Sequence, residues 1–208
     1  MRSRAPGNLF IVSSPSGGGK TTLIRRLIDD PPGAPMHFSV SHTTRPRRAG
    51  ERHGREYYFV TDSVFRKMAA REAFLEHNVV HGRHYGTSRK EVLGRLLRGE
   101  DVVLDIDVQG ARDIRRAYPK AVSIFIVLPS PKELERRLKR RGLDEDDEIQ
   151  RRLRAARSEI RQAKQFQYVI VNDDLERATV ELQSIVRATR VTHARQKERL
   201  ERIFREFR

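Results

Sequence analysis

Cysteine is absent from the 208-residue sequence, which excludes both a disulfide framework and a thiolate metal site. Long apolar runs are absent too, since none approaches the roughly 18 residues that a membrane span requires. The N-terminus also lacks the apolar stretch of a signal peptide. We therefore expect a soluble, cytoplasmic protein that does not associate with a membrane.

Acidic residues are scarce relative to basic ones. The chain has 28 Asp and Glu against 43 Lys and Arg, which gives a formal net charge of +15. Such an excess attracts polyanions, and both nucleic acids and nucleotides with several phosphates fit that description. The basic residues are spread along the chain and no recognised nucleic-acid-binding module is present. We therefore do not expect nucleic acid as a partner, while a homo-oligomer remains open.

Four short apolar runs divide the chain, and each is followed by a helical pattern. Such runs are typical of buried parallel strands, and their alternation with helices predicts a parallel sheet covered by helices. The runs span residues 9–12, 102–104, 122–128 and 168–171. The sequence therefore predicts a three-layer α/β fold with a parallel central sheet.

Two segments depart from this alternation. Residues 38–88 are rich in Arg, His, Tyr and Thr and predict short strands with one helix around 62–71, so we interpret them as an inserted lobe. A basic helical stretch after residue 130 has only Leu134 and Leu138 as an apolar stripe, as expected of a mobile lid. The predicted division is a core of residues 1–37, 89–129 and 166–208, a lobe of 38–88 and a lid of 130–165.

The C-terminal stretch from about Asp174 has the pattern of one long helix. Its last apolar residues recur at helical spacing, as Leu200, Ile203, Phe204 and Phe207. We expect this face to pack on the rest of the domain or on a second subunit. The alternative is a helix that binds a membrane or a partner.

A glycine-rich turn lies between the first apolar run and the first helical pattern. It ends in Gly19-Lys20-Thr21, as a phosphate-binding loop does, although Ser14 replaces the first glycine of that pattern. Successive glycines let backbone N–H groups approach phosphate oxygens, and the following helix adds its dipole. Lys20 suits the β and γ phosphates of ATP, and the Thr21 hydroxyl suits Mg²⁺. The predicted ATP-binding residues here are Ser14, Pro15, Ser16, Gly17, Gly18, Gly19, Lys20, Thr21 and Thr22.

Beyond this loop, a series of motifs resembles the guanylate kinase family. The series covers roughly residues 8–185 in the order found in that family, and its motifs are highly specific to it. They lie at residues 39–51, 54–59, 74–76, 84–87, 104–110 and 170–174. The resemblance implies an ATP:GMP phosphotransferase of purine nucleotide metabolism, which converts ATP and GMP to ADP and GDP.

The resemblance also implies a GMP site in the inserted lobe. Forked cations and hydroxyls suit a phosphate group, and the matching residues are Arg45, Arg48, Tyr57 and Tyr85. The phosphate of GMP is therefore expected among these four side chains.

Guanine presents N1–H and an exocyclic amine as donors and O6 as an acceptor. A carboxylate at Glu76 would accept from both donors, while hydroxyls at Ser41 and Thr87 would donate to O6. The family often has Ser where Thr87 stands, and the hydroxyl is kept. Adenine lacks those donors and would leave a buried carboxylate unpaired, so rejection can reach about 10⁴-fold.

Two carboxylates, Asp105 and Asp107, follow the second apolar run. We expect them to alternate across the strand and to point to opposite faces. A carboxylate at a strand end beside a phosphate loop is well placed for Mg²⁺, so Thr21 and Asp105 form the predicted metal site. The resemblance places Asp105 near the metal or GMP and Asp107 on the GMP side.

The predicted lid carries arginines suited to phosphoryl transfer, which needs aligned cations rather than covalent work by the protein. Arg137 and Arg141 are four residues apart and share a helix face. Together with Arg152 they match family positions around the transferred group. Asn172 resembles the family's contact on the adenine side. The predicted catalytic residues are Lys20, Arg45, Arg137, Arg141 and Arg152.

Two other functions are open to such a sequence. A related kinase that acts on a phosphorylated sugar would have no use for the base-reading set Ser41, Glu76 and Thr87. A guanylate-kinase-like domain that serves as a protein-binding scaffold tends to have a degraded phosphate loop. Here Lys20 and the lid arginines are present, and these features favour the kinase.

Overall fold

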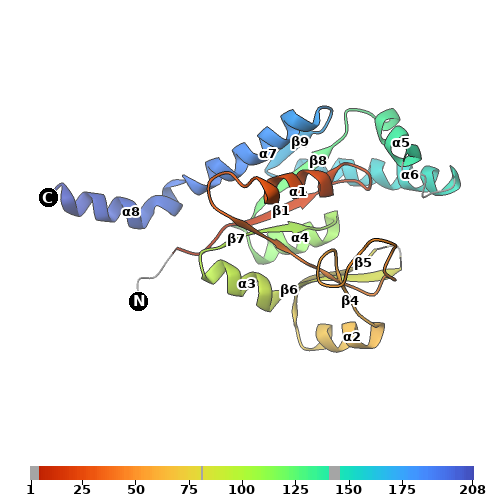
Figure 1. Cartoon of the computed structure of the whole chain (residues 1–208), viewed down its shortest axis with the longest axis horizontal. Helices are drawn as coiled ribbons and strands as arrows, with labels where there is room; N and C mark the ends of the chain where they lie inside the picture. The colour runs from red at the N-terminus through yellow and green to blue at the C-terminus, as the bar shows by residue number, and fades with distance from the viewer. Residues whose placement is uncertain (1–4, 81, 141–145) are drawn as a thin grey trace.

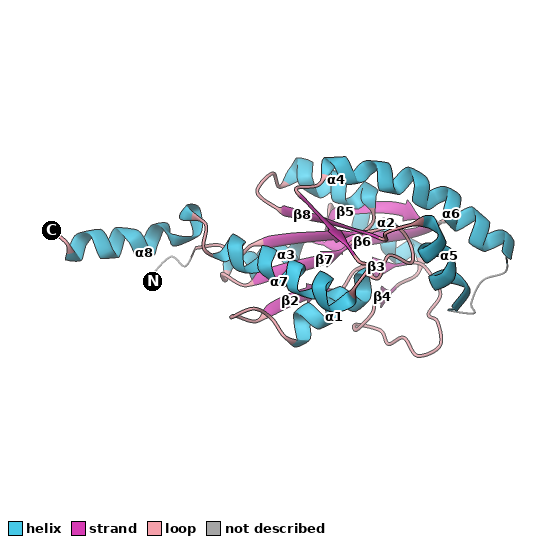
Figure 2. Cartoon of the chain, turned by 90° about the horizontal axis from the view of Figure 1, so that it is seen from above, coloured by secondary structure: helices cyan, strands magenta, loops and turns pink. Residues whose placement is uncertain are grey.

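The computed structural model describes residues 5–80, 82–140 and 146–208, so the predicted catalytic Arg141 lies outside the described residues. Within them, a five-stranded parallel sheet has helices on both faces (Figures 1 and 2), which confirms the predicted α/β fold. The strands follow the order β2-β7-β1-β8-β9. They are β1 (Leu9–Ser13), β2 (Met36–Ser39), β7 (Asp101–Asp105), β8 (Val122–Val127) and β9 (Tyr168–Val171).

The helices are α1 (Lys20–Asp29), α2 (Asp62–Ala70), α3 (Arg89–Leu97), α4 (Val108–Ala117), α5 (Pro131–Arg140), α6 (Asp146–Arg161), the 3₁₀ turn η1 (Gln162–Gln165), α7 (Leu175–Arg190) and α8 (His193–Glu206). None of the helices within the described ranges combines the length and the apolar character needed to cross a membrane.

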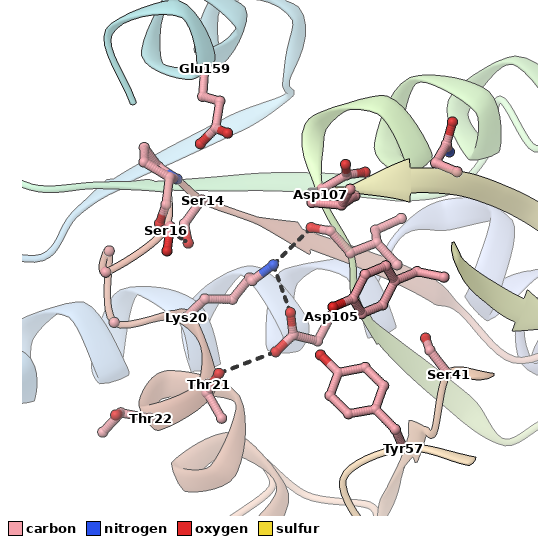
Figure 3. Close-up of a pocket in the computed structure, with 18 of the residues that line it drawn as sticks. Ser14, Ser16, Lys20, Thr21, Thr22, Ser41, Tyr57, Asp105, Asp107 and Glu159 are labelled. Atoms are coloured by element: carbon pink, nitrogen blue, oxygen red, sulfur yellow. Dashed lines mark hydrogen bonds and ion pairs between the residues drawn. The ribbon is translucent and has the colours of Figure 1, made fainter. Parts of the chain in front are cut away.

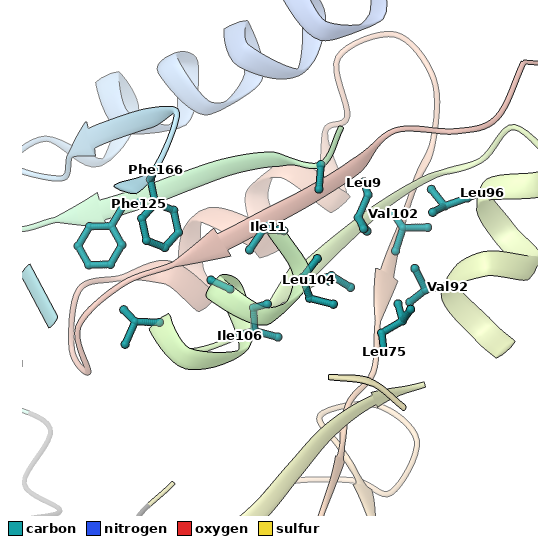
Figure 4. Close-up of a cluster of buried hydrophobic side chains, with 14 residues drawn as sticks. Leu9, Ile11, Leu75, Val92, Leu96, Val102, Leu104, Ile106, Phe125 and Phe166 are labelled. Atoms are coloured by element: carbon teal, nitrogen blue, oxygen red, sulfur yellow. The ribbon is translucent and has the colours of Figure 1, made fainter. Parts of the chain in front are cut away.

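Strand β1 is buried along its whole length. It contributes side chains to two hydrophobic cores, because successive side chains of a strand point to opposite faces of the sheet. Leu9 and Ile11 pack with α3 and α4 (Figure 4), whereas Phe10 and Val12 pack with α1 and α7. A strand that is apolar on both faces belongs at the centre of a covered parallel sheet. The apolar run in the sequence therefore determines the position of β1 in the fold.

A second sheet of four strands, in the order β4-β3-β6-β5, lies beside the central sheet. Its strands are β3 (His42–Thr43), β4 (Tyr58–Phe59), β5 (Phe74–Val80) and β6 (Arg83–Ser88). Helix α2 covers it through the fully buried Phe65, whose ring stacks on Phe74 with centroids 4.6 Å apart. Thr61 caps the start of α2 by accepting from the backbone N–H of Val64.

Helices α5 and α6 bury more apolar surface than the sequence suggests. Leu134 and Leu138 form a small core with Ile149 and Ala156, and all four side chains are buried. A Cβ added at Gly17 would lie 2.8 Å from Leu134 Cδ1 and 3.2 Å from Leu138 Cδ2, so this core packs directly against the glycine-rich loop. The apolar stripe expected from the sequence, Leu134 and Leu138, is therefore only part of this core.

The predicted single C-terminal helix is two helices. It breaks at Val191 and Thr192, where the Thr192 backbone is extended, and β-branched residues are weak helix formers. Helix α8 extends away from the body (Figures 1 and 2), and none of its fourteen residues is buried. Phe207 is 86% exposed, so the predicted packing of this face on the chain's own body is not found.

The end of α7 is anchored to the sheet by a buried ion pair. Arg190 Nε lies 2.7 Å from Asp101 Oδ2, and Asp101 is only 5% exposed. The other oxygen of Asp101 accepts from the backbone and side chain of Asn8, while Arg190 also donates to the carbonyls of Pro32 and Ala34. Four separate segments are thereby connected through one carboxylate and one guanidinium.

We predict that Arg190→Ala lowers the free energy of unfolding by about 2–4 kcal/mol, because it leaves a buried carboxylate without its cation. Chemical denaturation measures this value. Arg187→Ala is the matched control, since Arg187 is exposed one turn earlier on α7, and it should change stability by no more than about 0.5 kcal/mol. Equal losses in the two variants would contradict the anchoring role.

Candidate functional site

The glycine-rich loop connects β1 to α1 and needs glycine at defined places. Gly17 and Gly19 have φ values of +91° and +92°, in the left-handed region that favours glycine. An added Cβ at Gly19 would lie 2.2 Å from Asn172 Nδ2. The loop is therefore closely packed and adopts backbone conformations that favour glycine, and its N–H groups and the start of α1 provide the donors that a phosphate group needs.

A cavity of about 340 Å³ separates this loop from the second sheet (Figure 3). Its walls come from the glycine-rich loop and the start of α1 on one side, from β5 and β6 on another, and from the end of β7. The side chains and backbone that line it belong to Ser14, Pro15, Ser16, Gly17, Gly18, Gly19, Lys20, Thr21, Thr22, Ser41, Arg48, Tyr57, Glu76, Asn78, Val80, Tyr85, Asp105, Ile106, Asp107 and Glu159. Most residues predicted for the two nucleotides therefore meet at one cavity.

An adjoining cavity of about 890 Å³ lies over α1 and the turn around residues 45–57. It shares Thr21, Ser41, Arg48, Tyr57, Tyr85 and Asp105 with the first cavity and adds Arg45. Thr87 lines neither cavity because it is completely buried behind Glu76.

Lys20 and Asp105 form the polar centre of the first cavity (Figure 3). Lys20 Nζ lies 2.6 Å from Asp105 Oδ1 and donates to the Ile106 carbonyl at 2.8 Å. The Thr21 hydroxyl lies 3.4 Å from Asp105 Oδ2. Because β7 pairs with β1 in parallel, with Val12 opposite Asp105, this carboxylate is brought to the edge where the loop begins.

The prediction that Asp105 and Asp107 point to opposite faces is wrong. Strand β7 ends at Asp105, and both carboxylates line the same cavity. Residues two apart along a strand share a face, and here the chain also leaves the strand at Ile106. Asp107 Oδ1 accepts from the backbone N–H of Gly110 at 2.8 Å and so caps α4.

Glu76 is a buried acid aimed at the cavity by a β-bulge. The register between β5 and β6 shifts between Phe74 and Glu76, and this shift sets Glu76 opposite Thr87. Thr87 donates its hydroxyl proton to Glu76 Oε1 at 2.6 Å, and Asn78 Nδ2 lies 3.2 Å from Oε2. Burial raises the pKa of Glu76 to about 7, although both hydrogen bonds act in the opposite direction.

The arginines in the segment between β3 and β4 are held by Glu51, a residue for which the sequence predicted no role. Arg45 donates to Glu51 Oε1 at 2.7 Å, and the backbone N–H of Arg48 donates to Oε2 at 2.8 Å. The Arg45 guanidinium lies over the Tyr57 ring, 5.4 Å from its centroid. Tyr57 and Tyr85 meet edge to face, and burial raises the pKa of Tyr57, so its hydroxyl keeps its proton.

Asn172 and Arg137 hold the loop from its other side. Asn172 Nδ2 donates to the Gly18 carbonyl at 2.9 Å, and Arg137 donates to the Asn172 carbonyl at 3.0 Å. Arg137 is also paired with Glu133 at 2.7 Å. Neither Arg137 nor Arg152, which lies on α6, lines the two cavities described above.

A family model for guanylate kinases matches residues 6–189. The chain belongs to the guanylate kinase family. It is 48% identical over 198 residues to the guanylate kinase of Dechloromonas aromatica, covering 95% of this chain and 97% of the relative. It is 48% identical over 195 residues to that of Escherichia coli K12, covering 94% of each chain. The crystal structure of guanylate kinase from Anaplasma phagocytophilum matches with a TM-score of 0.75 at 33% identity, covering 92% of this chain and 90% of that one.

These findings confirm the resemblance on which the sequence analysis rested and the enzyme class that it implied, an ATP:GMP phosphotransferase. The lining of the cavity also includes two polar residues that were not predicted from the sequence, Asn78 and Glu159. Asn78 lies two residues beyond Glu76 on β5, so the two-residue period of a strand would have indicated that it faces the cavity. Glu159 of α6 reaches the cavity only because the tertiary fold brings α6 there, and no sequence pattern indicates this.

The raised pKa of Glu76 predicts a pH dependence of stability. The folded chain keeps the proton up to about pH 7, whereas the ordinary value for the unfolded chain is 4.5. The stability from this group is therefore full below pH 4.5 and is lost as the pH rises to about 7. The free energy of unfolding of the parent, measured against Glu76→Gln, should fall across this range and then level off. A constant difference between parent and variant would contradict the buried acid.

Proposed function

We propose that ATP binds the glycine-rich loop, that GMP binds the second sheet, and that the γ-phosphoryl group passes between them across the shared cavity. The products are ADP and GDP. The observation that carries this proposal is the buried Glu76 carboxylate, which faces the same cavity as the loop. We also propose the division into a core of residues 1–37, 89–129 and 166–208, a GMP lobe of 38–88 and a lid of 130–165.

Guanine recognition falls to Glu76 and Ser41. A carboxylate has about four acceptor positions, two on each oxygen, so Glu76 accepts from N1–H and from the exocyclic amine of the base. The Ser41 hydroxyl donates to O6. Thr87 was predicted to do the same, but it has a single proton and donates it to Glu76, so we assign it the role of holding the carboxylate. Adenine offers no matching donors, which leaves Glu76 unpaired and disfavours AMP.

The phosphate of GMP binds among Arg45, Arg48, Tyr57 and Tyr85. Arg45 is held at one end by Glu51 and lies against the Tyr57 ring, so little side-chain freedom is lost on binding. Tyr57 stays protonated and can donate to a phosphate oxygen. Asp107 faces this side of the cavity and caps α4.

The triphosphate of ATP binds the backbone N–H groups of residues 14–19 and the side chains of Lys20, Thr21 and Thr22. Lys20 turns from Asp105 and the Ile106 carbonyl to the β and γ phosphates. Asn172 and Arg137 border the loop at Gly18 and Gly19, and we place the adenine side of ATP there. Arg137, Arg141 and Arg152 supply positive charge to the transferred group when the lid closes.

The donor set at the end of β7 fits Mg²⁺. The Thr21 hydroxyl and the Asp105 carboxylate are hard oxygen donors next to the loop, and Mg²⁺ in kinases takes one or two protein ligands with the remainder from phosphates and water. The described residues contain no group of three or more His, Asp or Glu side chains that could hold a metal ion. Bound there, Mg²⁺ would neutralise charge on the β and γ phosphates.

A pair of variants tests the two half-sites separately. Lys20→Met should lower kcat by about 10³-fold, because it removes a cation from the transferred charge. Glu76→Gln should lower kcat/KM for GMP by about 10²-fold or more, because the NH₂ group of glutamine would face a hydrogen-bond donor of guanine. The same variant should leave KM for ATP unchanged. A coupled assay of ADP release, run with GMP, AMP, UMP, CMP and dTMP, measures both. Normal turnover by Lys20→Met would exclude the ATP site, and an equal loss for both substrates in Glu76→Gln would exclude the guanine reader.

A further inference from the structure

Asn78 occupies a place in the cavity to which the proposed reaction assigns no role. It lies two residues after Glu76 on β5 and therefore on the same face of the strand. Glu76 is paired with Thr87 of β6 and Asn78 with Tyr85. Of these four residues, Glu76, Asn78 and Tyr85 line the cavity, while Thr87 is buried behind Glu76. Asn78 is half-buried and lines the cavity with Glu76.

The Asn78 amide lies between two acids. Its Nδ2 is 3.2 Å from Glu76 Oε2 and 3.4 Å from Asp113 Oδ2 of α4. A primary amide nitrogen carries two protons, so one proton is available for each carboxylate. The neutral amide thus separates two negative charges that would otherwise face each other and stabilises both.

The hydrogen bond from Asn78 matters because the other surroundings of Glu76 disfavour its ionised form. The charged groups that act most on Glu76 are Asp107 and Asp113, and both disfavour its ionised form, as burial does. Helix α4 also approaches closely, since an added Cβ at Gly110 would lie 2.8 Å from Glu76 Oε2. Within the described part of the chain, two donors act against these influences: the hydroxyl of Thr87 on Oε1 and the amide of Asn78 on Oε2.

The hydrogen bonds to Glu76 also match the requirement of guanine. Each carboxylate oxygen accepts two hydrogen bonds. Thr87 uses one position on Oε1 and Asn78 uses one on Oε2, which leaves one position on each oxygen. Guanine presents two neighbouring donors, N1–H and the exocyclic amine. The protein therefore fills the positions that the base does not use and turns the other two toward the cavity.

We propose that Asn78 is a positioning residue for guanine recognition, which holds the Glu76 carboxylate ionised and turned toward the base, with Asp113 anchoring the amide. This inference rests on the proposed function, because it assumes that Glu76 reads guanine. It predicts that GMP binding weakens as the pH falls and Glu76 becomes protonated. It also predicts that Asn78 sets the pH at which this weakening begins.

The test is the pH profile of KM for GMP in Asn78→Ala between pH 6 and 9. Loss of the amide removes a donor to the ionised form, and a shift of one unit in pKa changes the ionised fraction up to tenfold. If the pKa of Glu76 rises from about 7 by about one unit, KM for GMP increases about fivefold at pH 7 and converges with the parent at pH 9. kcat and KM for ATP should stay as in the parent at each pH.

Two further variants separate charge from structure. Asn78→Asp keeps the size of the side chain but adds a third acid, and it should move the profile to higher pH by more than Asn78→Ala does. Asp113→Asn keeps an acceptor for the amide but removes a charge, and it should move the profile to lower pH. Val79→Ala is the matched control, since Val79 is the next residue on β5 and is 53% exposed on the other face; it should leave the profile unchanged.

The outcomes are distinguishable. Opposite shifts for the Asn78 and Asp113 variants, with recovery of Asn78→Ala at pH 9, support the proposal. A parental profile in Asn78→Ala, or the same loss at every pH, overturns it. Glu76→Gln serves as the reference: if it retains normal GMP use, the proposed function itself fails. If it loses GMP use while Asn78→Ala and Asn78→Asp follow the parent, only the role of Asn78 is rejected.

Discussion

Burying a carboxylate is costly, and the site around Glu76 is arranged around that constraint. Glu76 is 7% exposed and two further acids disfavour its ionised form, whereas the proposed recognition of guanine requires an ionised carboxylate. A bulge in β5 sets it opposite the hydroxyl of Thr87, and the strand period places Asn78 on its other side. Each Glu76 oxygen keeps one free acceptor position. Because these positions are buried, a nucleotide whose base lacks matching donors would leave them unpaired and bind less well.

The same arrangement connects the two sheets. Parallel pairing of β7 with β1 brings Asp105 to the start of the glycine-rich loop, while α4, which follows β7, approaches Glu76 at Gly110. The short segment from Asp105 to Gly110 therefore contacts Lys20 and Thr21 at one end and lies against Glu76 at the other. A shift of this segment would therefore move Asp105 and the surroundings of Glu76 together. Such coupling suits the proposed reaction, which must align two nucleotides.

The central sheet was predictable from the sequence because its strands are apolar on both faces and alternate with helices. The glycine-rich loop was predictable because its chemistry is local. The position of β2 in the central sheet was not, since Met36–Ser39 is short and only partly buried. Glu159 was not predictable either, because only the tertiary fold brings α6 to the cavity. Likewise, the break at Val191 and the common cavity of Asp105 and Asp107 depend on backbone geometry. By contrast, Glu51 contacts Arg45 and Arg48 nearby in the sequence, and the strand period would have indicated that Asn78 faces the cavity.

The most direct measurement of the central claim is a crystal structure with GMP and a non-hydrolysable ATP analogue bound together. The account predicts that N1 and the exocyclic amine of guanine lie within about 3.2 Å of the two Glu76 oxygens. It also predicts the triphosphate on residues 14–21, with the γ-phosphate directed at the phosphate of GMP. A guanine base bound away from Glu76, or a triphosphate bound outside the loop, would contradict it.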